Sequence, residues 1–132
     1  MKSKSKFKTP PLLVIDLGNT QLKWAAAVGA RVGEVHDAPS RPGGVAAAAR
    51  SWSGFKRAVV ASVVPRLNPL LLRKLSRAGV RWIHFVSPTS PLGVGIDYPN
   101  AESIGPDRLA NAAACRHFYG APCVAVDLGT AV

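Results

Sequence analysis

The sequence predicts an α/β fold built around a mixed β-sheet, and two observations support this class. The spacing of apolar residues predicts three strands at the start of the chain, followed by helices that are separated by single strands. A short sequence motif also occurs twice, as Asp16-Leu17-Gly18-Asn19-Thr20 and as Asp127-Leu128-Gly129-Thr130-Ala131, each time after an apolar run. The repeat predicts two related halves, of which the second only begins within this chain.

Strands are expected in the first part of the chain, because short apolar runs there are separated by turn residues. Residues 12–17 are almost continuously apolar, and Gly18-Asn19 marks a turn, so residues 22–28 are predicted to return as a hairpin partner. Residues 31–36 fit a third strand with Val32 and Val35 facing inward. The following segments are predicted to be a loop over Pro39–Gly44 and an alanine-rich helix over Val45–Trp52.

The second part of the chain alternates between strands and helices. Residues 66–78 carry leucines at helical spacing and are followed by Gly79, a common helix stop, so we expect a helix there. The other predicted elements are a buried strand over 58–64, a strand over 82–86, a Pro- and Gly-rich loop over 87–100, a helix over 104–119 and a last strand over 123–128.

This order of elements predicts a ribonuclease-H-like (actin-like ATPase) domain. Three strands followed by alternating helices and strands are typical of that sheet. We therefore expect a disordered basic tail over residues 1–10, an actin-like domain over 11–103, and the start of a second, similar domain over 104–132.

Composition restricts the class of protein. A chain of 132 residues supports one core, and no apolar run approaches the roughly 20 residues that cross a membrane. The basic start of the chain lacks the apolar segment of a signal peptide, which predicts a cytoplasmic protein. Cys115 and Cys123 lack metal-site spacing and are expected to be buried free thiols.

The formal net charge of +10 raises the question of a nucleic-acid partner. Four of the seventeen cations precede residue 9, the others are scattered, and no zinc-finger, homeodomain or RNP pattern is present. A solvated basic surface, or attraction of anionic substrates such as nucleotides, explains the charge better than nucleic-acid binding does.

The residue types of the repeated motif are those that bind phosphate groups and their metal ions. An Asp at the end of a buried strand can hold Mg²⁺, and the glycine after it lets the backbone approach a phosphate. Backbone N–H groups and the Thr hydroxyl can donate to phosphate oxygens, and Lys23 adds a positive charge. One copy alone could equally be an ordinary hairpin turn, but two copies on apolar strands favour nucleotide binding.

A second candidate site is Gly105-Pro106-Asp107-Arg108, at the start of the predicted helix over 104–119. Asp107 can accept a proton from a substrate hydroxyl, while Arg108 and the helix N–H groups hold an anionic substrate. Tyr98 precedes the motif and could pack on that substrate. The alternatives are that Asp107 is a first-turn acid, Arg108 an exposed cation and Tyr98 part of a lid on the core.

Taken together, the motifs resemble those of the type III pantothenate kinases. The similarity rests on Asp16 to Lys23, Ser62-Val63-Val64-Pro65, Gly95 to Tyr98, Gly105 to Ala112 and Asp127 to Ala131, in this order and spacing. The resemblance implies an enzyme of the acetate and sugar kinase, heat-shock and actin superfamily that phosphorylates pantothenate with ATP, the first step toward coenzyme A. It also implies a homodimer.

The resemblance also implies roles for single residues. Asp107 matches the general base, Tyr98 a substrate-contacting tyrosine and Asp127 a ligand of a monovalent cation, potassium or ammonium. Asp16 is the candidate ligand of the Mg²⁺ that accompanies ATP. The first ATP-binding loop corresponds to Asp16, Leu17, Gly18, Asn19, Thr20, Gln21, Leu22 and Lys23; Thr130 matches a further ATP contact; and Gly105, Pro106, Asp107 and Arg108 match the pantothenate-binding motif.

This chain is shorter than the members of that family, whose sequences continue for about as many residues again. We therefore expect this chain to carry half of the active-site cleft and to be inactive alone. One alternative is another kinase or phosphatase of the same superfamily, against which the Gly105-Pro106-Asp107-Arg108 motif argues. The other is a non-enzymatic nucleotide-binding protein or an accessory transcription factor of the same family.

Overall fold

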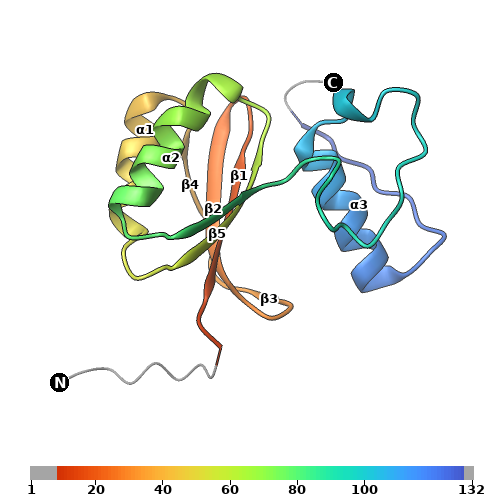
Figure 1. The fold of residues 1–132 in the computed structure, drawn as a ribbon, viewed down its shortest axis with the longest axis horizontal. Helices are drawn as coiled ribbons and strands as arrows, with labels where there is room; N and C mark the ends of the chain where they lie inside the picture. The colour runs from red at the N-terminus through yellow and green to blue at the C-terminus, as the bar shows by residue number, and fades with distance from the viewer. Residues whose placement is uncertain (1–8, 130–132) are drawn as a thin grey trace.

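The computed structural model describes residues 9–129, which contain one mixed β-sheet with helices on both of its faces (Figure 1). The sheet has six strands, and its main order is β3-β2-β1-β5-β6, with β4 also pairing with β2. The strands are β1 (Leu12–Leu17), β2 (Gln21–Val28), β3 (Arg31–Val32), β4 (His36–Pro39), β5 (Arg57–Ser62) and β6 (Trp82–Phe85). The predicted α/β class is confirmed.

Strand direction explains why the sheet is mixed. β2 returns antiparallel beside β1 because a short turn joins them, whereas β5 and β6 follow helical crossovers and run parallel to β1 and to each other. The helical elements are α1 (Pro42–Ala48), η1 (Ala49–Ser51), η2 (Pro65–Leu67), α2 (Asn68–Arg77), η3 (Ala101–Ser103) and α3 (Pro106–Tyr119). The helices α1 and α2 cover one face of the sheet, and α3 lies on the other side (Figure 1).

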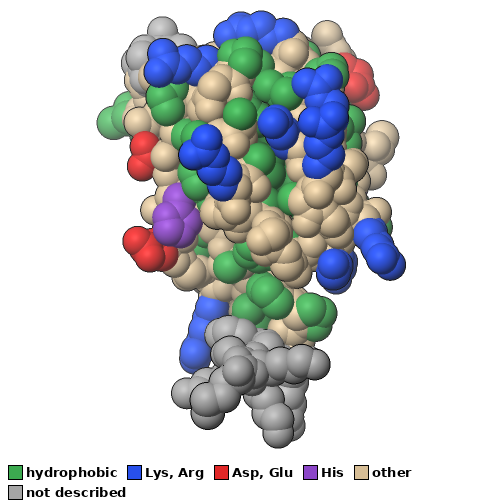
Figure 2. Space-filling view, turned by 90° about the vertical axis from the view of Figure 1, so that its left-hand side faces the viewer, with side chains coloured by type: hydrophobic (Ala, Val, Ile, Leu, Met, Phe, Trp, Pro, Cys, Tyr) green, Lys and Arg blue, Asp and Glu red, His purple; other side chains and the backbone are tan. Residues whose placement is uncertain are grey.

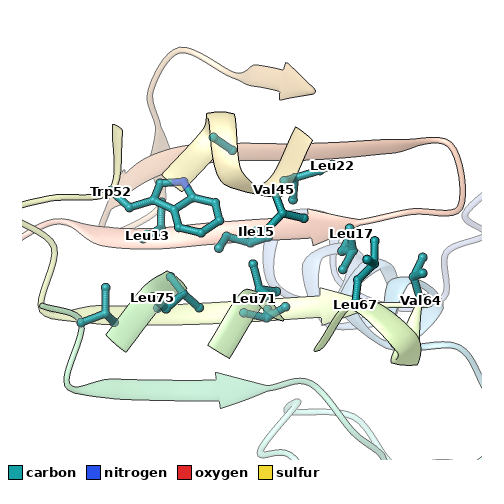
Figure 3. Close-up of a cluster of buried hydrophobic side chains, with 14 residues drawn as sticks. Leu13, Ile15, Leu17, Leu22, Val45, Trp52, Val64, Leu67, Leu71 and Leu75 are labelled. Carbon is teal, nitrogen blue, oxygen red and sulfur yellow. The ribbon is translucent and has the colours of Figure 1, made fainter. Parts of the chain in front are cut away.

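The hydrophobic core lies between the sheet and the α1–α2 layer (Figure 3). Alternate side chains of β1 point into it, so Leu13, Ile15 and Leu17 are buried. Leu71 and Leu75 of α2 meet them at i, i+4 spacing and are fully buried. The opposite side of α2 carries exposed arginines, as the leucine periodicity predicts.

The predicted third strand over residues 31–36 is wrong as a single element. The chain forms β3 and β4 instead, and both pair with β2. Val32 and Val35 are 60% and 58% exposed, so they do not point into the core as predicted. Gly33 interrupts the run between the two short strands, although its N–H still donates to the Ala26 carbonyl of β2 at 2.8 Å.

The first helix also begins earlier than predicted. α1 starts at Pro42 within the predicted loop over Pro39–Gly44, because proline is well suited to a first helical position. Gly44 lies against the Pro39 carbonyl, where a side chain would collide with the backbone. Glycine is therefore required for the close approach of α1 to the end of β4.

The predicted strand over residues 123–128 does not form. The segment pairs with no strand among residues 9–129, and Val124, Val126 and Leu128 are 88%, 78% and 85% exposed. An apolar run becomes a strand only when a neighbouring strand satisfies its backbone groups. Cys115 is half-buried and Cys123 is exposed, so the predicted burial of Cys123 is also wrong.

No second domain is evident in the part of the chain that the structure describes. α3 contacts β5 of the same sheet. The predicted boundary between residues 103 and 104, and the predicted tail over residues 1–10, stay predictions. None of the helices within residues 9–129 has the length and apolarity that crossing a membrane requires.

Candidate functional site

Asp16 and Lys23 are brought together by the β1–β2 hairpin. They are register partners across the antiparallel pair, so their side chains lie on the same face of the sheet. Asp16 is also paired with Ala61 of the parallel neighbour β5. The carboxylate thus stands near the carboxyl ends of two parallel strands, a place where open α/β sheets commonly bind ligands.

The turn between these strands has a tightly held backbone. The Gly18 N–H donates to the Gln21 carbonyl at 3.0 Å, and a Cβ on Gly18 would lie only 3.1 Å from that oxygen. Asn19, Thr20 and Gln21 are exposed. The side chains of Leu17 and Leu22 are fully buried in the core, so these two predicted ATP-site residues can offer only backbone groups to a ligand.

Residues Ser62-Val63-Val64-Pro65 hold the end of this sheet in place. The Val63 N–H donates to the Leu17 carbonyl at 3.0 Å, which ties the end of β5 to the end of β1. The Ser62 hydroxyl donates to Asn68 Oδ1 at 2.6 Å and accepts from the Val64 N–H at 3.2 Å. This motif therefore positions the Asp16 end of the sheet relative to α2.

The first turn of α3 presents Asp107. Its Oδ1 accepts a hydrogen bond from the Arg108 N–H at 2.8 Å, and the Arg108 N–H also points to the Gly105 carbonyl at 3.0 Å. A Cβ on Gly105 would lie 2.5 Å from Asp107 Oδ1, so only glycine leaves room for the carboxylate in this position. Pro106 occupies the first turn, and Leu109 is buried and anchors the helix.

A cavity of about 420 Å³ joins these elements. Asp16, Lys23, Asp107 and Asp127 all line it, although they come from four separate parts of the sequence. Its other walls are largely apolar and come from the sheet and α3, namely Val14, Ile15, Trp24, Ala25, Val32, Val35, Val59, Ala61, Val86, Ala110 and Asn111. The arrangement places three carboxylates and one ammonium group around one concave surface.

Asp107 and Asp127 both act on the Asp16 carboxyl group. Partial burial raises the pKa of Asp16 above its ordinary value, and the negative charges of Asp107 and Asp127 raise it further, while Lys23 opposes the shift. Such repulsion is relieved when a cation binds, and carboxylate oxygens are the ligands that Mg²⁺ prefers. Within residues 9–129, however, no group of three acidic, histidine or cysteine side chains is close enough to form a complete metal site.

Some predicted site residues lie apart from this cavity. Tyr98 is 57% exposed in the loop before η3 and is not among the lining residues. Arg108 faces a neighbouring cavity of about 740 Å³, which Asp127 also lines. Thr130 lies outside the described residues.

Asn111 lines both cavities and was missed as a candidate. It follows Asp107 by four residues on α3, so the two side chains share one side of the helix. That i, i+4 spacing is the signal that could have identified it.

The amino-acid sequence was compared with known protein families. The family model of the type III pantothenate kinases matches residues 12–132. The chain belongs to the type III pantothenate kinase family. Among curated relatives, the type III pantothenate kinase of Akkermansia muciniphila is 53% identical over 78 residues, which are 59% of this chain and 31% of the relative.

Two longer matches extend over most of this chain. The type III pantothenate kinase of Solibacter usitatus is 31% identical over 133 aligned positions, covering 92% of this chain and 51% of the relative. That of Rubrobacter xylanophilus is 34% identical over 134 positions, covering 91% and 50%. The chain thus spans at most about half the length of these relatives.

Proposed function

We propose that this chain supplies the phosphate-binding and base-carrying half of a kinase that transfers the terminal phosphoryl group of ATP to the hydroxyl group of pantothenate. One observation carries the proposal. Asp107, at the start of α3, lines the same cavity as Asp16 and Lys23 of the β1–β2 hairpin. A candidate base and a candidate phosphate site therefore face each other across one small space.

Each of these residues would have a separate role in phosphoryl transfer. Lys23 and the backbone N–H groups of the exposed turn residues Asn19 and Thr20 would hold the phosphate oxygens of ATP. Asp107 would accept the proton of the pantothenate hydroxyl as its oxygen bonds to phosphorus and the bond to the leaving ADP oxygen breaks. Gly105 leaves room for that carboxylate, and the Arg108 N–H orients it.

Cation binding is part of the same proposal. Asp16 is the proposed Mg²⁺ ligand, and ATP oxygens or water would complete the coordination, since the described residues hold no complete metal set. Mg²⁺ neutralises charge on the phosphates when it is bound. Asp127, which lines the same cavity, is the proposed ligand of potassium or ammonium.

The remaining roles are proposed from the family. Tyr98 and Arg108 would contact pantothenate, and Thr130 would contact ATP. We further propose that a second, similar domain closes the cleft, that the whole protein is a cytoplasmic homodimer, and that the 132-residue polypeptide alone binds nucleotide weakly without turnover. Phosphoryl transfer needs groups that converge from both sides of the substrate, and the chain spans about half of the Solibacter relative.

A chimera tests the proposal. This chain replaces the aligned half of the Solibacter usitatus relative, and transfer of labelled phosphate from ATP to pantothenate is measured. We expect turnover in the chimera and none in its Asp107→Asn variant. A folded chimera that binds ATP without phosphorylating pantothenate would instead support the nucleotide-binding alternative.

A further inference from the structure

The distribution of charge in the fold is uneven. Between Asp37 and Asp97 the sequence contains nine lysines and arginines and no acidic residue. This stretch includes α1, α2, β5 and β6, and basic side chains are spread over the α1–α2 face with few acidic ones among them (Figure 2). Lysines and arginines without acidic neighbours repel one another, which favours binding of a polyanion.

Five of these cations gather at one end of the sheet. The Lys56 carbonyl accepts hydrogen bonds from the N–H groups of Arg81 and Trp82 at 2.9 and 3.1 Å, which joins the start of β5 to the start of β6. Lys56 Nζ lies beside Gly79, just after α2, whose last turn carries basic residues. We call this end of the sheet, with Lys56, Arg57, Lys74, Arg77 and Arg81, the basic end. Arg57 lies on the sheet face opposite α2, because its neighbour Ala58 points into the core between the sheet and α2.

An aromatic side chain accompanies the basic end. Trp82 lies on the edge strand β6 and is 45% exposed. The Arg57 guanidinium lies 4.7 Å from the centre of its ring, and the His84 ring stacks beside it at 5.8 Å with an interplanar angle of 15°. Exposed aromatic rings beside cations are the elements with which proteins bind unpaired bases and their phosphates.

We propose that the basic end binds a single-stranded nucleic acid that crosses the end of the sheet, with phosphates on Arg77, Arg81 and Lys56 and a base stacked on Trp82. Trp82 pairs with Arg57 and lies with it on the face opposite α2, because Ile83 beside it packs against the core. This interaction lies at the end of the sheet remote from Asp16, because β5 and β6 begin here and run parallel to β1. It is separate from the proposed kinase function and does not depend on it. The scattered cations of the sequence did not predict it, because only the fold gathers them.

The observations favour a nucleic acid over an anionic membrane. A membrane-binding surface needs a broad apolar strip beside its cations. Among the described residues of α2 and β6, only Leu72 and Trp82 are large exposed apolar side chains. Three of the five cations are arginines, whose planar guanidinium suits phosphate oxygens and stacks on rings.

The test is fluorescence anisotropy of a labelled oligouridine of about 20 nucleotides, long enough to span a typical single-strand site, titrated with the 132-residue chain. We expect saturable binding that weakens with salt. Arg77→Glu/Arg81→Glu should weaken it by about tenfold or more and reduce the salt slope by about 1 to 2. Trp82→Ala should weaken it by about tenfold, and Trp82→Phe should restore most of the loss.

The matched control is Arg41→Glu/Arg66→Glu. It makes the same change in charge at exposed positions that follow the carboxyl ends of β4 and β5, away from the basic end. We expect its affinity to change by less than about threefold, with every variant folded by circular dichroism. Equal losses in both double variants, unchanged affinity in Trp82→Ala, or binding to phosphatidylserine vesicles without binding to oligouridine would overturn the proposal.

Discussion

Asp16 and Lys23 are direct register partners across the β1–β2 pair, and both line the same cavity. The short turn at residues 18–21 therefore fixes a carboxylate and an ammonium group side by side on one face. Partial burial raises the pKa of Asp16, the charges of Asp107 and Asp127 raise it further, and Lys23 partly offsets this rise.

Replacing Asp107 by asparagine should reduce turnover without disturbing the fold. The amide oxygen can still accept the hydrogen bond from the Arg108 N–H, but asparagine cannot take a proton. We expect kcat of the chimera to fall by roughly 10²-fold or more, with KM for pantothenate nearly unchanged. Steady-state kinetics of the purified variant check this, and a near-normal kcat would exclude Asp107 as the base.

Removing the charges of the hairpin should weaken ATP binding rather than folding. Asp16→Asn deletes the proposed Mg²⁺ ligand, and Lys23→Ala deletes a phosphate contact. Calorimetric titration with MgATP should show weaker binding for both variants, with melting temperatures within a few degrees of the parent. Early melting together with unchanged ATP affinity per folded molecule would make the hairpin a purely structural element.

Asp16 should also affect the pH dependence of stability. Its pKa is raised in the folded state, so the folded protein holds this proton more tightly than the unfolded chain does. The stability it contributes is present below the unfolded value of 3.8 and is lost as the pH rises through the folded pKa. Asp16→Asn should therefore be neutral or stabilising at pH 7, and this gain should shrink toward pH 4 in urea melts.

Gly105→Ala should reduce activity by displacing the Asp107 carboxylate. The new Cβ would lie 2.5 Å from Asp107 Oδ1, so the side chain must rotate away from its hydrogen bond to Arg108. We expect kcat of the chimera to fall by about tenfold or more, because small displacements of a reacting group are costly. Gly43→Ala is the control, since its Cβ would meet nothing within 4 Å, and it should leave kcat unchanged.

Leu71→Ala should destabilise the domain strongly. The side chain is fully buried between α2 and the sheet, so truncation loses apolar burial and opens a cavity, at a cost of about 2–5 kcal/mol. Its neighbour Leu72 is 41% exposed, and Leu72→Ala should cost less than about 1 kcal/mol. Chemical denaturation of both variants compares them directly, and equal losses would contradict the assignment of the core.

Local pattern predicted much of the fold. The apolar run over residues 12–17, the Gly18-Asn19 turn and the leucine spacing of α2 each reflect interactions between residues close in the chain. The division of residues 31–36 into β3 and β4, and the exposure of Val32 and Val35, could not be predicted in this way. Both features depend on which strands pair with each other in the sheet, and the apolar character of a residue does not specify the strand with which it pairs.

By itself, the sequence indicated the family and brought forward Asp16, Lys23, Gly105 and Asp107 as candidate site residues, because they stand in motifs whose spacing is local. Only the tertiary structure decided that Asp16, Lys23, Asp107 and Asp127 share one cavity, while Tyr98 lies outside it. It also decided that the basic end forms beside Trp82. The physical reason is that strand pairing and crossover connections bring distant segments together, and these contacts leave no periodic signal in the chain.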